Sequence, residues 1–223
     1  MIVKTLMKTF ARWSVRHCLL AAALILGGAA NAATVTFTGV ANSVDRGGIY
    51  TGFYGLQLDS ETILGLCDAR FSQVGSTWTA DIRSYAEIQG GAVGKFNSPS
   101  TPASLAKYSQ AGWLFSQIGT LAGNDYAGQA DIQEAIWKIM APGYTLIGSG
   151  AGSWFAAATS GIYDSFNWSG VMRVVTPFPL IQNSIDLQEF LVGPGIAVVP
   201  VPAAVWLFGS ALGVLALGRR RRA

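Results

Sequence analysis

Apolar and polar residues alternate over several stretches of the central chain, a period of two that is typical of β-strands with one buried face. Val35 and Phe37, for example, share one side of the first such stretch. Strands are predicted over residues 34–40, 48–59, 62–67, 76–83, 170–178 and 184–192. Gly75-Ser76 supplies a turn before the fourth of them. We therefore expect a β-rich first half, with further strands near the end of the central region.

A second period, of three and four residues, predicts two helices between these strands. The first begins at Ser100-Thr101-Pro102, where a hydroxyl that can cap a helix precedes a proline suited to its first turn. The apolar residues of its predicted buried face are Leu105, Tyr108, Ala111, Phe115 and Ile118. The second helix is predicted over residues 126–140 and ends before Pro142-Gly143. The predicted fold class is α+β, a β-rich, sandwich-like domain with an inserted helical pair.

The first 32 residues have the order of charge and hydropathy that is typical of a secretory signal peptide. Four basic residues precede an apolar run over residues 19–26, and Ala30-Asn31-Ala32 follows it. The run is shorter than the roughly 20 residues that span a bilayer, so we expect cleavage after Ala32 and no permanent anchor. Cys18 precedes the run instead of following it, which argues against a lipoprotein.

A second apolar segment, over residues 203–218, carries no charge and is followed by four arginines, Arg219 to Arg222. A helix from residue 198 to residue 218 would extend about 31 Å, enough to cross a bilayer. The arginines would stay on the cytoplasmic side and leave the preceding domain outside. Two interpretations stay open for this transmembrane segment, an ordinary tail anchor and a sorting signal.

The order of motifs in residues 196–223 resembles the PEP-CTERM sorting signal. Val199-Pro200-Val201-Pro202 stands where the name-giving members of that family have Pro-Glu-Pro. Trp206-Leu207-Phe208-Gly209-Ser210, the apolar helix and the Arg tail then follow in the family's order. The resemblance implies that an exosortase-type membrane protease is a partner of this segment. It also implies a biofilm or outer-surface setting, because such proteins are typical of Gram-negative bacteria that make exopolysaccharide.

Residues 33–195 form one predicted exported domain, long enough for a hydrophobic core of its own. Eight of the fifteen Lys and Arg residues lie in the two terminal segments, so this domain has seven of them against twelve Asp and Glu. Its net charge is therefore −5, although that of the whole chain is +3. Nucleic-acid binding requires a basic face, and this composition excludes it for the exported domain.

The cysteine and histidine content limits the catalytic and metal-binding chemistry that the processed chain can perform. Once the leader is removed, Cys67 is the single cysteine, and no histidine remains because His17 lies in the leader. This composition excludes Ser-His-Asp and Cys-His catalysis, His-based zinc binding and an internal disulfide in the processed chain. We predict no cofactor and no metal.

Two segments, Ile63-Leu64-Gly65-Leu66-Cys67-Asp68 and Ile132-Gln133-Glu134-Ala135-Ile136-Trp137, resemble the cysteine and glutamine motifs of thioester domains in surface adhesins of Gram-positive bacteria. In that family a Cys near a strand end attacks the amide of a Gln on a helix, expels ammonia and leaves an internal thioester. Ile132 stands where the family pattern has threonine. The resemblance implies a thioester between Cys67 and Gln133, which aromatic residues such as Trp137, Trp113 and Tyr85 would shield from water.

A buried free thiol is the alternative for Cys67, because cysteine is among the most often buried residue types. Asp59, Glu61 and Asp68 suggest a calcium site or a carboxylate hydrolase, but their spacing fits no calcium loop. We expect a non-enzymatic surface or extracellular-matrix protein, adhesive if the thioester forms, whose partners include exopolysaccharide or surface proteins. A hydrolase acting on exopolysaccharide is the alternative function.

Overall fold

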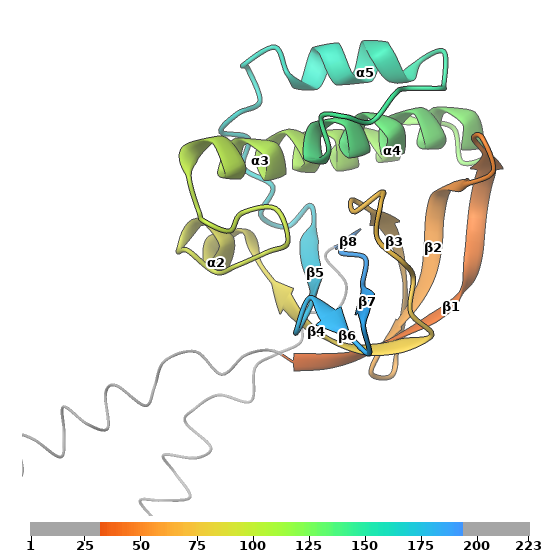
Figure 1. The fold of residues 1–223 in the computed structure, drawn as a ribbon. Coiled ribbons are helices and arrows are strands. Elements are labelled where there is room, and N and C mark those ends of the chain that lie inside the picture. The colour runs from red at the N-terminus through yellow and green to blue at the C-terminus, as the bar shows by residue number, and fades with distance from the viewer. Residues whose placement is uncertain (1–31, 194–223) are drawn as a thin grey trace, which may run out of the picture. The chain divides into compact units, whose positions relative to one another are not determined.

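The computed structural model describes residues 32–193, which form a strand-rich barrel with helices packed on one side (Figure 1). The first strands are β1 (Ala32–Asp45), β2 (Tyr50–Leu58), β3 (Glu61–Cys67) and β4 (Thr77–Arg83). The helices follow as α2 (Tyr85–Gln89), α3 (Pro102–Gln117), a 3-10 turn (Ile118–Thr120), α4 (Tyr126–Met140) and α5 (Ala151–Ala158). The last strands are β5 (Arg173–Pro177), β6 (Ile181–Gln182), β7 (Ile185–Asp186) and β8 (Phe190–Val192). The α+β prediction is confirmed.

The main sheet closes on itself in the order β1-β2-β3-β8-β5-β4, and all neighbouring strands are antiparallel. Closure depends on β1, which pairs with β4 through its first five residues and with β2 along most of its length. Register shifts between Phe37 and Gly39 and between Ala41 and Ser43 mark bulges in β1, and Gly39 has a φ of 136° that favours glycine. The predicted sandwich-like arrangement is therefore wrong in its topology, because bulges bend one continuous sheet into a barrel.

The two predicted helices are confirmed, and the first begins with the predicted type of cap. Thr101 caps α3 by accepting a hydrogen bond from the Ser104 N–H, with Pro102 in the first turn. Asp125 caps α4 by accepting from the Gly128 N–H. The structure adds the short helices α2 and α5, so the helical insertion is larger than the predicted pair.

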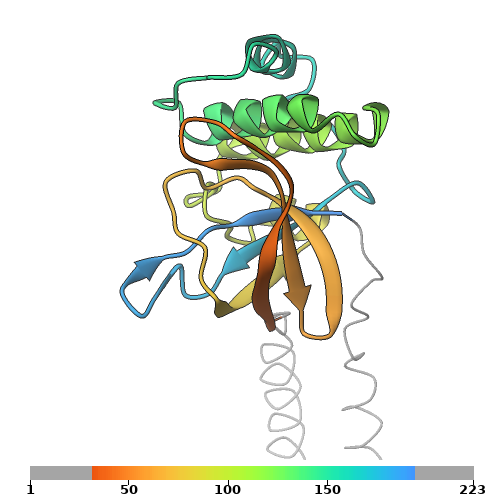
Figure 2. The same ribbon diagram turned by 90° about the vertical axis from the view of Figure 1, so that its right-hand side faces the viewer.

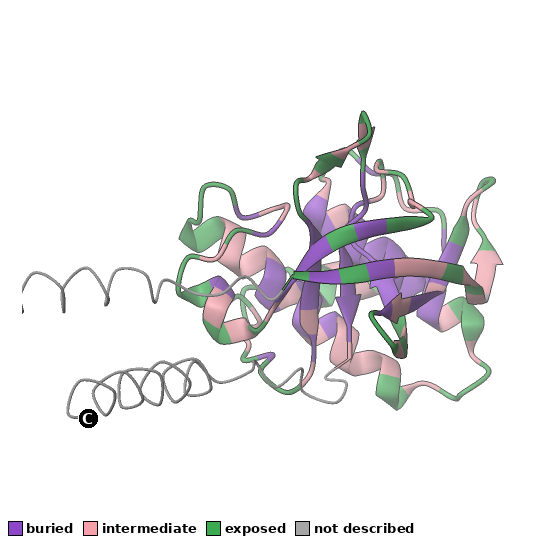
Figure 3. Cartoon of the chain, turned by 90° about the horizontal axis from the view of Figure 1, so that it is seen from below, coloured by how far each residue is buried: buried purple, intermediate pink, exposed green. Residues whose placement is uncertain are grey.

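The helices form layers outside the barrel (Figure 2). Helices α3 and α4 lie side by side next to the barrel, and α5 packs on their outer face. One core cluster fills the barrel and includes Cys67, Trp137 and Phe190. A second cluster, which includes Leu66 and Trp168, lies between the barrel and the helices. Buried residues accordingly concentrate on the strands and on the inner faces of the helices (Figure 3).

Within residues 32–193, no helix is both long enough and apolar enough to cross a membrane. The predicted signal peptide, apart from Ala32, lies outside the described residues, and so do the sorting motif, the predicted transmembrane helix over residues 203–218 and the Arg tail.

Candidate functional site

The structure brings Cys67 and Gln133 together at the end of the barrel that α4 covers. Both residues are fully buried. The Gln133 side-chain nitrogen donates a hydrogen bond to the Cys67 carbonyl oxygen at 2.5 Å, and the Gly52 N–H donates to the Gln133 side-chain oxygen at 3.2 Å. One carboxamide thus bridges β2 and β3, and it lies next to the residue that carries the thiol.

Cys67 is the last residue of β3 and pairs with Phe190 of β8. Its side chain belongs to the core cluster that fills the barrel. Burial raises the pKa of the Cys67 thiol far above its ordinary value, and the neighbouring Asp68 adds to this effect, which the Trp137 indole and Arg70 only partly oppose. The thiol is therefore protonated at neutral pH and has little nucleophilic character by itself.

Aromatic residues and one cation enclose this part of the site. The Trp137 ring lies 5.4 Å from Tyr144, edge to face, and the Arg70 guanidinium carbon lies 5.4 Å from the Trp137 ring centre and 5.8 Å from that of Tyr144. The prediction that Trp137 shields the site is consistent with this packing. Trp113 and Tyr85 do not take part, because both pack against the second cluster, between the barrel and the helices.

Two acidic residues on α4, which the sequence analysis did not identify, fix the helix to neighbouring loops. The buried Glu134 carboxylate accepts hydrogen bonds from the N–H groups of Ile147, at 2.6 Å, and Gly148, at 3.1 Å. Asp131 and Glu134 form ion pairs with Arg46, at 3.0 and 3.5 Å, in the loop between β1 and β2. Because Gly52 lies near the start of the strand after this loop, the ion pairs help to set the position of Gln133 relative to Gly52. The spacing of three residues between Asp131 and Glu134 was the available signal in the sequence.

The structure does not bring together the three acidic residues considered for calcium binding or hydrolysis. Asp59 lies in the turn before β3 and accepts a hydrogen bond from the Thr34 N–H, and Glu61 is the first residue of β3. Asp68 follows the other end of this strand, about 20 Å away at the usual rise per residue. Across residues 32–193, no group of three or more His, Cys, Asp or Glu side chains is arranged to hold a metal ion.

Asp68 instead belongs to a buried carboxyl pair with Glu189. Glu189 accepts hydrogen bonds from the Tyr108 hydroxyl at 2.6 Å, the Lys95 N–H at 2.7 Å and the Thr176 hydroxyl at 2.5 Å. Both Asp68 oxygens are buried without a donor among the described residues. Burial, followed by the negative charge of Glu189, raises the pKa of Asp68 well above its ordinary value. Asp68 is therefore a neutral acid whose proton can bond to Glu189, since two adjacent buried carboxylates cannot both ionise at low cost.

Comparisons with protein-family models, with curated proteins and with solved structures find no match to this chain.

Proposed function

We propose that this is a non-enzymatic, exported surface or extracellular-matrix protein that attaches covalently to a partner through a thioester between Cys67 and Gln133. The observation that supports the proposal is the direct contact of the Gln133 carboxamide with Cys67 in a fully buried site. An uncharged thioester also suits this environment better than an ionised thiolate does, because burial penalises the charged form.

The proposed step is an acyl transfer within the chain. The Cys67 sulfur forms a bond to the Gln133 side-chain carbon, the bond from that carbon to the side-chain nitrogen breaks, and the thiol proton leaves with that nitrogen as ammonia. The Gly52 N–H, which donates to the Gln133 side-chain oxygen at 3.2 Å, would stabilise the negative charge that develops on this oxygen. The Trp137 and Tyr144 rings would limit hydrolysis by water until a partner arrives. An amine on the partner, such as a lysine side chain, would then take the acyl group and release the thiol.

Intact-mass spectrometry of the processed protein, isolated from its own cell surface, tests the bond. We expect a mass lower than the sequence mass by one ammonia, and a Cys67 thiol that resists alkylation in mild denaturant without nucleophiles. Methylamine should open the thioester, add its mass at Gln133 and free the thiol. Burial alone predicts the unmodified mass and a thiol that reacts fully after unfolding, and that pair of results would contradict the proposal.

Two variants separate the bond from effects of burial. Gln133→Ala removes the acyl donor, so the sequence mass and full alkylation of the unfolded chain are expected. Gln129→Ala, one turn earlier on α4, removes another buried glutamine and should retain the ammonia loss. Loss of the mass change in both variants would point to damage of the helix instead of removal of a reacting group.

The proposed attachment to the membrane rests on the apolar segment over residues 203–218 and its Arg tail. Deleting residues 206–223 is expected to release the domain into a soluble fraction, because the remaining chain loses most of the apolar length needed to span a bilayer. Fractionation followed by immunoblotting would measure the release, with the full chain as control. A host without the exosortase should accumulate the unprocessed protein, whereas equal processing in both hosts would favour a plain tail anchor.

A further inference from the structure

A half-buried arginine lies at the edge of the Cys67 site, and no acidic side chain neutralises it. Arg70 follows Cys67 by three residues, in the turn after β3. Arg46 and Arg83 each form two ion pairs with acidic side chains, whereas Arg70 forms none within residues 32–193. The Arg70 guanidinium therefore keeps an uncompensated positive charge beside the proposed thioester.

The acidic side chains around the site are engaged with other partners. Asp68 pairs with Glu189. Glu134 pairs with Arg46 and accepts hydrogen bonds from two backbone N–H groups. The pairing that Arg70 lacks among the described residues can therefore be supplied by a carboxylate of a binding partner.

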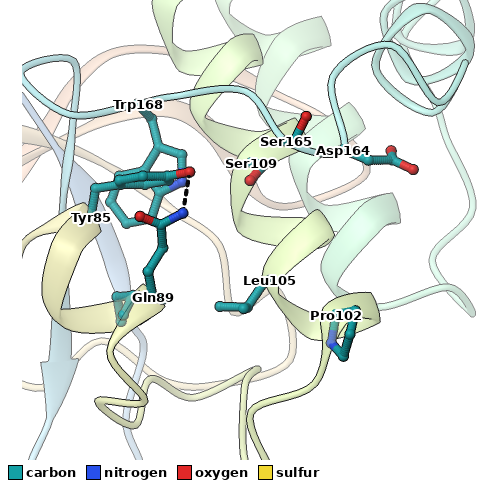
Figure 4. A pocket seen from close by; sticks show the side chains of 9 residues that line it. Tyr85, Gln89, Pro102, Leu105, Ser109, Asp164, Ser165 and Trp168 are labelled. Carbon is teal, nitrogen blue, oxygen red and sulfur yellow. Dashed lines mark hydrogen bonds between the residues drawn. The ribbon is translucent and has the colours of Figure 1, made fainter.

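The cavity on the helical side of the domain offers no comparable group. It holds about 240 Å³ between α2, the first half of α3 and the segment between α5 and β5 (Figure 4). The described residues that line it include no Lys or Arg. Trp168, in its wall, belongs to the second core cluster, whereas Cys67 belongs to the first. Recognition of an anionic partner beside the proposed thioester therefore falls to Arg70.

The Arg70 guanidinium lies against aromatic rings, two of which belong to the core cluster that holds Cys67. Its carbon is 5.4 Å from the ring centre of Trp137, 5.5 Å from that of Phe71 and 5.8 Å from that of Tyr144. Trp137 is 1% exposed and Phe71 is 71% exposed, so Arg70 lies between a core ring and a surface ring. Its Nε is buried without a partner among the described residues, whereas Nη1 and Nη2 are not buried in this way. A partner can therefore reach the two terminal nitrogens.

The charge of Arg70 also acts on the reacting group. Burial and then the neighbouring Asp68 raise the pKa of the Cys67 thiol, and the Trp137 indole and Arg70 oppose this rise. When an amine displaces the sulfur from the proposed thioester, a thiolate leaves, and a nearby positive charge stabilises it. A carboxylate bound at Arg70 would therefore be held close to the acyl group that reacts.

We propose that Arg70 determines the partner of this site by binding a carboxylate beside the reacting amine, so that the target is a lysine in an acidic protein segment. The role rests on the proposed thioester, whose acyl carbon the amine attacks. A guanidinium forms charge-assisted hydrogen bonds with a carboxylate, whereas it repels an isolated ammonium group. The exported domain has a net charge of −5, so this attraction acts at contact and does not steer partners from a distance.

Small amines test the selectivity in the reaction itself. The processed protein would be incubated with glycine, β-alanine, 4-aminobutanoate or 6-aminohexanoate, and with the amide of each, at equal concentrations of unprotonated amine. Intact-mass spectrometry would follow the adduct at Gln133. We expect at least one amino acid to react about fivefold faster than its amide, the upper value for an accessible ion pair, with an optimum chain length that matches the span from Arg70 to the acyl carbon. Equal rates within every pair would contradict the proposal.

Variants assign the preference to one side chain. Arg70→Met removes the charge but keeps a long side chain on the aromatic rings, so the preference for the amino acid over its amide should disappear. Arg70→Lys keeps the charge without the planar fork and should retain part of the preference. Lys107→Met removes the same charge from α3 and should retain all of it. A preference that survives in Arg70→Met, or that Lys107→Met lowers equally, would contradict a role specific to Arg70.

A second measurement does not depend on the thioester. Treatment with methylamine, followed by its removal, leaves the Cys67 thiol free whether or not a thioester was present. Iodoacetate and iodoacetamide, which are similar in size and differ in charge, would then alkylate the folded protein, and the unfolded chain gives their intrinsic ratio of rates. We expect the folded protein to favour iodoacetate about fivefold relative to that ratio, and Arg70→Met to lose the difference. The same ratio in both states, or no reaction of the folded protein with either reagent, would contradict the proposal, since a carboxylate at Arg70 would then not lie near the sulfur.

The two measurements distinguish failure of the anion site from failure of the thioester. A wild-type mass without loss of ammonia, together with a preference for iodoacetate that depends on Arg70, would contradict the thioester and support the anion site. Loss of ammonia without either preference would contradict the anion site alone.

Discussion

Replacing Glu189 by leucine is expected to lower the free energy of unfolding by about 3–5 kcal/mol, the usual cost of breaking a fully buried polar cluster. The substitution removes the acceptor for the Tyr108 and Thr176 hydroxyls and for the Lys95 N–H. It also removes the neighbouring carboxylate that can accept the Asp68 proton. Urea denaturation of the processed protein, followed by tryptophan fluorescence, would measure the loss.

The neighbouring Gln188 offers a matched control. Its side chain is also buried, but it makes one hydrogen bond, to the Ser72 carbonyl oxygen at 2.9 Å. Gln188→Leu should therefore cost only about 1 kcal/mol. If Glu189→Leu costs no more than Gln188→Leu, the carboxylate does not organise the cluster in the way the hydrogen bonds indicate.

The position of Glu189 connects this cluster to the proposed thioester site. Glu189 immediately precedes Phe190, which pairs with Cys67 across β3 and β8, and the Asp68 N–H donates to the Glu189 carbonyl oxygen. Cys67 and Asp68 are adjacent, but Cys67 belongs to the cluster inside the barrel while Asp68 pairs with Glu189. The carboxyl pair therefore stabilises the pairing of β3 with β8, which positions Cys67, without taking part in the proposed chemistry.

Local elements of the fold were predictable because their signals lie within a few residues. Thr101-Pro102 and Asp125 begin the two long helices, and both carry cap chemistry that a sequence displays directly. Helix α5 was missed because Gly150 at its start supplies no side-chain cap and its eight residues are too few to display a repeated apolar face. Barrel closure was missed because alternation marks a half-buried strand without specifying which strand pairs with it.

In the candidate site, too, features with a local sequence signal were predictable and pairings between distant residues were not. Cys67 and Gln133 were identified through motifs, and the structure places them in contact. Asp68 was considered only together with Asp59 and Glu61, its neighbours in sequence, whereas its partner in the structure is Glu189. A pairing between residues so far apart along the chain leaves no periodic or local signal.

Asp68→Asn is expected to remove a pH dependence of stability from the domain. The pKa of Asp68 in the folded protein lies well above the ordinary value of 3.8, so the folded state holds a proton that the unfolded chain has released. The contribution of protonated Asp68 to the free energy of unfolding is fully present below about pH 4. It falls as pH rises toward the folded-state pKa, by about 1.4 kcal/mol per pH unit at most. The carboxamide that the substitution introduces can still donate to Glu189 but cannot ionise. Wild type and variant should therefore be similarly stable near pH 4, and the variant should be more stable at pH 8.

Urea denaturation at several values between pH 4 and pH 8 would measure this difference. The charges that face Asp68 are those of Glu189 and Lys95, and Tyr108 completes the cluster. Asp186→Asn is the matched control, because burial acts to raise the pKa of Asp186 but hydrogen bonds from Lys95 and Ser72 outweigh burial and lower it. Its contribution to stability is lost only as pH falls through and below the ordinary carboxyl range, so this control should keep the wild-type slope between about pH 5 and pH 8. If the free energy of unfolding of Asp68→Asn changes with pH as that of the wild type does, Asp68 is already ionised in the folded domain. That result would contradict the hypothesis that Asp68 shares a proton with Glu189.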